Sequence, residues 1–209
     1  MSVTLWFMGR PASGKSTLAK RIEAELRDQD HKVENLDGDE VRQNLHPDLG
    51  FTREDRALNN RRTAFVCKLL NRNGIDAVTA MITPFREAQQ RAREIIESSG
   101  TFVLIYVKCP VDVAADRDPK GLYEKARAGK IENFTGINHP FQEPLNPEII
   151  VDTAENDVDE CVDKILRELS ARDVFDVGPE TDYELELSRD EEQDVLERLE
   201  QRGYFDDSG

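Results

Sequence analysis

The chain has 209 residues, of which 38% are hydrophobic, and its formal net charge is −15. This length is enough for one well-packed core and a short appendage. No apolar run approaches the ~20 residues that a membrane span needs, so no membrane association is expected.

Two features bear on location. Cys67, Cys109 and Cys161 are scattered without metal-ligand spacing, which is typical of a reducing compartment. The first apolar run leads directly into a glycine-containing loop, so we expect no signal peptide. A cytoplasmic location follows as an expectation.

The net negative charge comes entirely from residues 151–209. Residues 1–150 carry 22 acidic and 22 basic side chains, whereas the remainder carries 21 and 6. Because nucleic-acid binding needs a basic footprint, no nucleic-acid partner is expected. The acidic end could serve solubility, partner binding or adaptation to high salt, and an ordinary solvated surface is the favoured interpretation.

The first predicted element is a strand over Val3–Met8, followed by a loop and a helix. Gly9 and Gly14-Lys15-Ser16 match the phosphate-loop pattern G-x-x-x-x-G-K-[ST] in the strand–loop–helix setting that confirms it. Backbone N–H groups at such a helix N-terminus attract phosphate oxygens, Lys15 supplies charge, and Ser16 offers a hydroxyl to Mg²⁺. The predicted ATP-binding residues are Gly9, Arg10, Pro11, Ala12, Ser13, Gly14, Lys15, Ser16 and Thr17.

Strands and helices alternate along the chain, which predicts an α/β fold with a parallel sheet covered by helices on both faces. Ligands are then expected at the edge formed by the carboxyl ends of the strands. Further strands are predicted at 32–36, 77–82, 102–107 and 149–151, and helices at about 15–29, 53–73, 85–99, 110–117 and 155–171.

Two carboxylates follow the second strand. Asp37 and Asp39 flank Gly38 beside the phosphate loop, where they could hold Mg²⁺ through water or accept a proton from an attacking hydroxyl. Arg42 could pair with an anionic group of a second substrate. The alternative is an ordinary Asp-Gly turn.

The next helix is predicted to begin after Thr52 as its N-cap, with Asp55 in the first turn. Arg56 and Asn59 share one face of this helix. Together with Phe51 they suit a substrate that has a planar ring and a charged oxyanion. A core phenylalanine and a solvated basic helix are the alternatives.

The third strand ends at Ile82-Thr83-Pro84 without the aspartate that often binds Mg²⁺ in phosphate-loop proteins. The metal would therefore depend on Ser16 and the Asp37/Asp39 pair. Thr83 is either the N-cap of the following helix, with Pro84 at its first position, or a hydroxyl directed into the site.

A long connection over residues 118–141 combines basic residues, glycines and aromatics. Long connections in compact domains are usually functional, so we expect a mobile lid that closes over the substrates. Beyond the domain of residues 1–171, residues 172–209 are expected to form an acidic linker (173–187) and a short helix after the capping pattern at Ser188.

Considered together, these stretches resemble the adenylylsulfate kinase family, phosphate-loop enzymes of sulfate activation. The resemblance covers about residues 2–155 and rests on blocks in one order: GRPASGKST, LDGDEVR, DLGFTREDRALNNRR, ITPFRE, RDPKGLYEKARAGKIENFTGI and HPFQEPLNPEI. It implies that ATP donates its γ-phosphoryl group to the 3′-hydroxyl of adenosine 5′-phosphosulfate (APS), giving 3′-phosphoadenosine 5′-phosphosulfate (PAPS) and ADP with Mg²⁺.

The resemblance also implies roles. Phe51 and Phe134 would contact the nucleotide-sulfate, and Asp39 would approach its 3′-hydroxyl. The implied catalytic residues are Lys15, Asp37, Asp39 and Thr83, and the metal ligands are Ser16, Asp37 and Asp39. The implied substrate-binding residues are Asp39, Arg42, Phe51, Arg56, Asn59, Ile82, Thr83, Lys120, Leu122, Phe134, Thr135 and Phe141.

Two positions depart from the family pattern: Thr83 where serine is common, which disfavours a phosphoenzyme, and Pro119 where a small aliphatic residue is usual. A homodimer and a sulfate adenylyltransferase partner are expected. Two alternatives remain: another small-molecule kinase (gluconate, shikimate or nucleoside type), and a non-catalytic nucleotide-binding partner of a sulfurylase.

Overall fold

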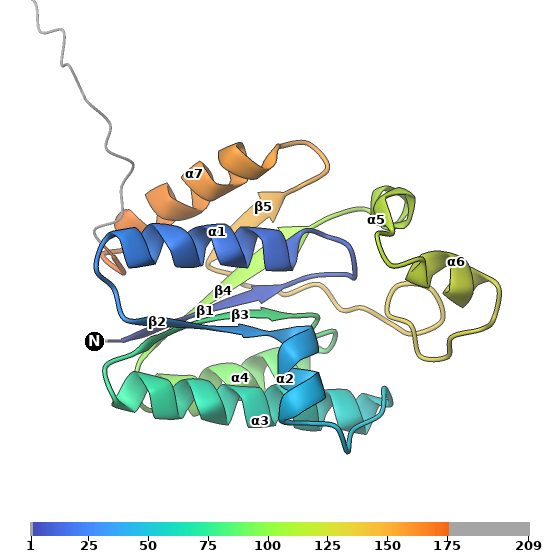
Figure 1. Ribbon diagram of the computed structural model, residues 1–209, viewed down its shortest axis with the longest axis horizontal. Helices are drawn as coiled ribbons and strands as arrows, with labels where there is room; N and C mark the ends of the chain where they lie inside the picture. Colours follow the sequence, from blue (N-terminus) through green and yellow to red (C-terminus); the bar gives the residue numbers. More distant parts are fainter. Residues whose placement is uncertain (1, 176–209) are drawn as a thin grey trace, which may run out of the picture. The chain divides into compact units, whose positions relative to one another are not determined.

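A computed structural model describes residues 2–175, which form one five-stranded sheet whose strands all run parallel, in the order β2-β3-β1-β4-β5 (Figure 1). The predicted α/β class is confirmed. The strands are β1 (Val3–Met8), β2 (Val33–Asp37), β3 (Asp76–Met81), β4 (Thr101–Lys108) and β5 (Ile149–Asp152). The linker and helix expected beyond residue 175 lie outside the described residues.

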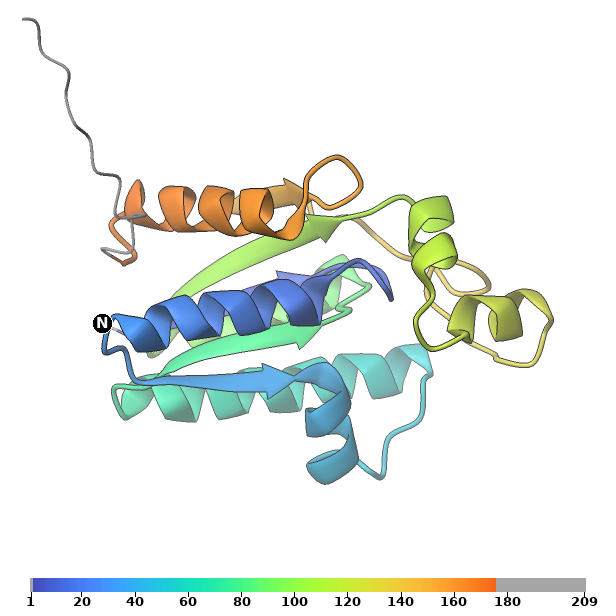
Figure 2. The ribbon, with the colours of Figure 1, turned by 45° about the horizontal axis from the view of Figure 1, so that its top comes forward.

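Helices cover both faces of the sheet (Figures 1 and 2). On one face lie α1 (Lys15–Asp28) and α7 (Val158–Ser170), and on the other lie α3 (Arg53–Arg72) and α4 (Arg86–Glu97). Beyond the carboxyl ends of the strands lie α5 (Val111–Arg117) and two short helices, α2 (Gly38–Asn44) and α6 (Leu122–Arg127). Among residues 2–175, none of the helices is both long and apolar enough to cross a bilayer.

Alternation along β1 explains why the sheet is buried on both sides. Leu5 and Phe7 pack with α1 and α7, whereas Trp6 and Met8 pack with α3 and α4. Every residue of β1 is buried, as expected for the central strand of a parallel sheet, and each large side chain contributes about 1.5–3 kcal/mol. The phosphate loop (residues 9–17) therefore follows a fully buried strand, and it lies at the carboxyl end of the central strand of the sheet.

Two short helices were not predicted, and in both an aspartate before the helix accepts hydrogen bonds from N–H groups of the first turn. Asp37 accepts a hydrogen bond from the Asp39 N–H at the start of α2. Asp118 accepts from the N–H groups of Leu122, Tyr123 and Glu124 at the start of α6. Because each helix has at most seven residues and a largely polar sequence, neither shows an extended apolar period.

Helix boundaries decide one open alternative. Thr52 caps α3 as predicted, with its side chain accepting from the Asp55 N–H. The predicted cap at Thr83 is wrong, because α4 begins at Arg86 with Phe85 at the N-cap. At the other end of the domain the chain turns after α7, and Phe175 is buried 4.9 Å from the His31 ring. The first residues of the expected extended linker are therefore packed against the core.

Candidate active site

A cavity of about 1170 Å³ lies at the carboxyl ends of the strands, between the phosphate loop, α2, the start of α3 and the 118–141 connection, hereafter the lid. Its volume exceeds the roughly 300–1,000 Å³ of an ordinary small-molecule pocket, so it has room for two nucleotide-sized ligands. The predicted site residues that line it are Pro11, Ala12, Gly14, Lys15, Ser16, Thr17, Asp37, Asp39, Arg42, Phe51, Arg56, Asn59, Ile82, Thr83, Lys120, Leu122, Phe134 and Thr135.

The phosphate loop requires glycine at two positions for different reasons. A Cβ on Gly9 would lie 2.4 Å from the carbonyl oxygen of Val107, so any side chain there would displace β4. Gly14, at the N-cap of α1, has φ +92°, a left-handed conformation that favours glycine. The loop can therefore direct its N–H groups to one point at a helix N-terminus, which suits an anion.

Lys15 is buried at the floor of the cavity. Its ammonium donates to the Arg10 carbonyl oxygen at 2.6 Å and to Ser13 Oγ at 3.4 Å. Burial lowers the pKa of Lys15 to about 8, although the carboxylates of Asp39 and Asp37 oppose this shift. A phosphate group in the loop would supply the counter-charge that this ammonium needs.

Ser16 and Asp37 converge beside the loop. The Ser16 hydroxyl donates to Asp37 Oδ2 at 2.7 Å, and Asp37 Oδ1 accepts from the Asp39 N–H at 2.9 Å. Partial burial favours the protonated carboxyl, but these hydrogen bonds together lower the pKa of Asp37. The result is an ionised carboxylate and a hydroxyl side by side, as a hard cation prefers.

The lid closes over this corner. Lys120 forms an ion pair with Asp39, and this hydrogen bond raises the pKa of Lys120. Tyr123 anchors the lid to the phosphate loop, because its hydroxyl donates to the Pro11 carbonyl oxygen at 2.9 Å. The Phe134 ring meets Tyr123 edge-on at 4.9 Å. The lid thus holds the ammonium group of Lys120 beside Asp39, the carboxylate predicted to approach the 3′-hydroxyl.

Two guanidinium groups lie close to the Phe51 ring at the α3 end of the cavity. The ring is 53% exposed, with Arg42 4.5 Å and Arg56 5.5 Å from its centroid. The alternative of a core phenylalanine is therefore excluded. Burial lowers the pKa of Arg56 to about 10, and the nearby Arg42 adds to this shift. A half-exposed ring flanked by two cations suits a nucleobase that carries an anionic tail.

The neighbouring helix face is not a solvated basic surface, since Arg56 and Asn59 are 7% and 6% exposed. Arg56 donates to the Phe51 and Asn133 carbonyl oxygens, which joins α3 to the lid. Asn59 Oδ1 lies 2.8 Å from Nδ1 of the buried His46, a residue that the sequence analysis did not select. This contact fixes the orientation of the Asn59 amide in the cavity wall.

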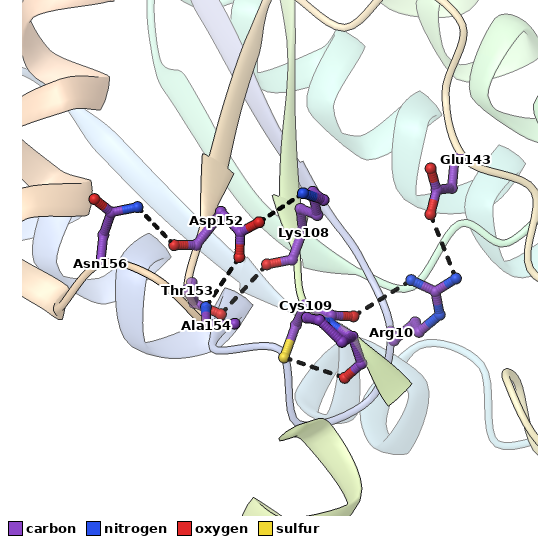
Figure 3. Close-up of polar contacts among 9 residues, drawn as sticks. Arg10, Lys108, Cys109, Glu143, Asp152, Thr153, Ala154 and Asn156 are labelled. Atoms are coloured by element: carbon purple, nitrogen blue, oxygen red, sulfur yellow. Dashed lines mark hydrogen bonds and ion pairs between the residues drawn. The ribbon is translucent and has the colours of Figure 1, made fainter. Parts of the chain in front are cut away.

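Four predicted residues do not line the cavity: Gly9, Arg10, Ser13 and Phe141. Figure 3 shows Arg10 directed toward Glu143, 3.5 Å away, while its other nitrogen donates to the Cys109 carbonyl oxygen. Phe141 packs under this guanidinium, 4.6 Å from it, and stacks on Tyr106. Arg10 thus joins the phosphate loop to Phe141 at the end of the lid and to Glu143 just after it.

The opposite wall contains residues that the sequence analysis missed: Arg117, Thr153, Asn156 and Asp157. Arg117 donates to Thr153, whose hydroxyl donates to the Ser13 carbonyl oxygen at 3.0 Å. The Lys108–Asp152 ion pair holds this corner together (Figure 3). No motif marks these residues, because only the sheet order brings the loop after β5 to the phosphate loop.

Comparisons with known proteins agree with this architecture. The family model described as adenylylsulphate kinase matches residues 1–152. An adenylyl-sulfate kinase of Halothermothrix orenii is 48% identical over 170 residues (81% of this chain, 90% of that protein), and one of Staphylococcus carnosus is 47% identical over 174 residues (83% and 87%).

The same family is found among solved structures. The structure of the Mycobacterium tuberculosis APS kinase in complex with AMPPNP and APS superposes with a TM-score of 0.78 at 37% identity, covering 81% of this chain and 98% of that one. By sequence, architecture and site, the chain belongs to the adenylylsulfate kinase family.

Proposed function

We propose that this chain transfers the γ-phosphoryl group of ATP to the 3′-hydroxyl of APS, giving PAPS and ADP. The observation that carries the proposal is a single cavity with a phosphate loop and, at its α3 end, the half-exposed Phe51 beside Arg42 and Arg56. A structure of the Mycobacterium tuberculosis relative holds AMPPNP and APS together, as expected for two ligands in such a cavity.

ATP would bind through the phosphate loop. The backbone N–H groups of the loop would bind the β-phosphate. Lys15 would give up its contact with the Arg10 carbonyl oxygen and bind phosphate oxygens instead. The base of the donor nucleotide would then lie beside Arg117, which is on the opposite wall next to Thr153. This assigns one end of the cavity to the donor.

APS would bind at the α3 end. Its adenine stacks on Phe51, a mode that uses the ring face, while Arg42, Arg56 and Asn59 bind the phosphosulfate and the base. Asp39 accepts a hydrogen bond from the 3′-hydroxyl, and Lys120 binds the phosphates. The remaining wall of this subsite comprises Ile82, Thr83, Leu122, Phe134 and Thr135.

A divalent cation, Mg²⁺ in this proposal, fits the donor set beside the loop. Ser16 and Asp37 present oxygen ligands 2.7 Å apart, and Asp39 lies two residues further on, in the first turn of α2. Residues 2–175 offer no cluster of three or more metal-binding side chains, but Mg²⁺ bound with a nucleotide takes most of its ligands from phosphate and water. Once bound, the ion neutralises charge on the transferred group.

Positioning and charge neutralisation then suffice for the reaction. The phosphoryl transition state is loose, so Asp39 has only to orient the acceptor hydroxyl and accept its proton late. Asp39 is paired with Lys120, and an acceptor hydroxyl that binds Asp39 would compete with this ion pair. Lys120 then becomes available to the anionic substrates.

The experiment is ADP release by the purified chain with MgATP and one acceptor at a time. APS should support turnover, whereas gluconate, shikimate and nucleosides should not. Turnover with one of these alone would replace the proposal by another small-molecule kinase. An absence of turnover with tight APS binding would instead support the non-catalytic partner of a sulfurylase.

Three further expectations belong to this proposal: a homodimer, a sulfate adenylyltransferase partner and a cytoplasmic location. The exposed apolar pair Phe65 and Leu69 on α3 supports the first of them. Light scattering of the chain alone and with a sulfate adenylyltransferase tests the two associations.

A further inference from the structure

Trp6 is fully buried in β1, lies outside the cavity lining, and makes one specific polar contact. Its indole N–H donates to Thr83 Oγ1 at 2.9 Å, across 77 positions of sequence. Thr83 follows β3 and does line the cavity, although it is only 1% exposed. A core side chain is thus bonded directly to a wall residue of the site.

The chemistry of the indole fixes the direction of this hydrogen bond. Tryptophan has a donor and no acceptor, so the Thr83 oxygen must accept. The threonine hydroxyl hydrogen is then left to donate elsewhere, and no hydrogen bond from it to another described residue (2–175) is found. Because Thr83 lines the cavity, a ligand bound there is a candidate acceptor for that hydrogen.

The backbone at Thr83 supports a functional reason for the contact. Its φ is +42°, a left-handed conformation that is an outlier for a β-branched residue. Such strain persists where the surroundings impose it, and it concentrates at ligand sites. Gln89 adds a second restraint by donating to the Thr83 carbonyl oxygen at 3.2 Å.

We infer that Trp6 is a positioning residue that sets the Thr83 hydroxyl as a hydrogen-bond donor to the nucleotide accepting the phosphoryl group. The inference rests on the proposed function, since it takes APS as that nucleotide. It assigns Thr83 a binding role that needs only its hydroxyl hydrogen. It also gives a buried tryptophan an effect on acceptor affinity and none on ATP affinity.

The kinetic test is a double-mutant cycle between Trp6→Phe and Thr83→Val. Trp6→Phe should raise the KM for APS about 3- to 10-fold, the loss expected for one hydrogen bond, with the KM for ATP unchanged. In the Thr83→Val background Trp6→Phe should have no further effect on KM. An equal effect in both backgrounds would reduce Trp6 to a packing role and overturn the inference.

A matched control separates packing from polarity. Phe102 packs against the Trp6 ring with centroids 6.0 Å apart, whereas the indole N–H donates to Thr83. Phe102→Leu should lower the Tm and leave the KM for APS unchanged. If it raised that KM as much as Trp6→Phe does, the hydrogen bond would not be the cause.

A second measurement needs no change in the core, because Trp6 is the one tryptophan in the sequence. Its emission in the protein with ADP and Mg²⁺ should change as APS is added, in the wild type and in Thr83→Ser but not in Thr83→Val. An equal change in Thr83→Val, or none in a wild type that turns over APS, would overturn the inference. Failure of wild-type turnover would instead remove the proposed function.

Discussion

At the scale of single residues, Phe51 distinguishes a nucleotide acceptor from other acceptors. Phe51→Ala removes one stacking face and should weaken APS binding by about 1–3 kcal/mol, while ATP affinity stays unchanged. Titration calorimetry with each nucleotide measures both. Phe65→Ala is a matched control, because Phe65 is 52% exposed but does not line the cavity. Equal losses for APS and ATP in Phe51→Ala would contradict its assignment to the acceptor.

Lys15 tests the donor subsite. Lys15→Ala should abolish phosphoryl transfer with the fold retained, since it removes the only phosphate-loop ammonium that lines the cavity among residues 2–175. ADP release and circular dichroism together make the measurement. Residual turnover close to that of the wild type would refute a role for Lys15 at the phosphates.

The lowered pKa of Lys15 also predicts a pH dependence. Burial lowers it from 10.5 to about 8, so the ligand-free protein holds the positive charge below pH 8 and loses it above. Phosphate binding favours the charged form. ATP affinity should therefore be nearly constant below pH 8 and fall about tenfold per pH unit above it.

In Lys15→Arg the guanidinium remains charged over this range, so ATP affinity should lose its slope above pH 8 whatever its absolute value. The ATP dissociation constant of both proteins, measured from about pH 6.5 to about pH 9.5, shows whether the slope is lost in Lys15→Arg. The same slope in both would assign the titration to another group.

At this scale the sequence predicted positions better than contacts. The spacing of Arg56 and Asn59 placed both on one face of α3, and the structure shows that both are buried. It could not predict that Asn59 pairs with His46 or that Arg10 turns away to Glu143, because both partners come from other segments. Local patterns carry no information on such pairings.

At the scale of elements, α6 joins the lid to the phosphate loop. Tyr123→Phe removes the hydrogen bond to the Pro11 carbonyl and should lower the free energy of unfolding by about 0.5–1.5 kcal/mol. It should also increase amide exchange across 118–141, because the lid loses an anchor. Thermal unfolding and hydrogen exchange measure the two effects.

Lys125→Ala serves as the control, since it changes an exposed side chain of the same helix. It should leave both the stability and the exchange unchanged. Faster exchange in Lys125→Ala, or unaltered exchange in Tyr123→Phe, would contradict the anchoring role of the tyrosine. The mobility of the lid stays a prediction until this exchange is measured.

Helices and strands could be predicted from the sequence where their buried faces require a pattern of apolar residues. All five strands and the four long helices follow apolar patterns, and their predicted ends agree with the structure to within a few residues. The short helices α2 and α6 were missed because hydrogen bonds from their first-turn N–H groups to Asp37 and Asp118, and not apolar stripes, specify them. An aspartate followed by acidic first-turn residues was the available signal at α2.

At the scale of the molecule, sheet order creates the site. The strands run in the order β2-β3-β1-β4-β5, so loops distant in sequence meet around the phosphate loop. Alternating strands and helices predicted a parallel sheet, and the family resemblance its function, but the wall at Arg117 and Thr153 depends on β5 lying beside β4. Only the order of the strands in the folded sheet brings these two residues to the cavity.

The proposed reaction is phosphoryl transfer between two adenine nucleotides in one cavity. The most direct measurement follows the label from [γ-³²P]ATP with APS and Mg²⁺ and identifies the labelled product. We predict that the label appears on the 3′-oxygen of APS, with the sulfate retained and ADP formed in equal amount. Label that stays in ATP, or reaches any other acceptor position, would contradict the account.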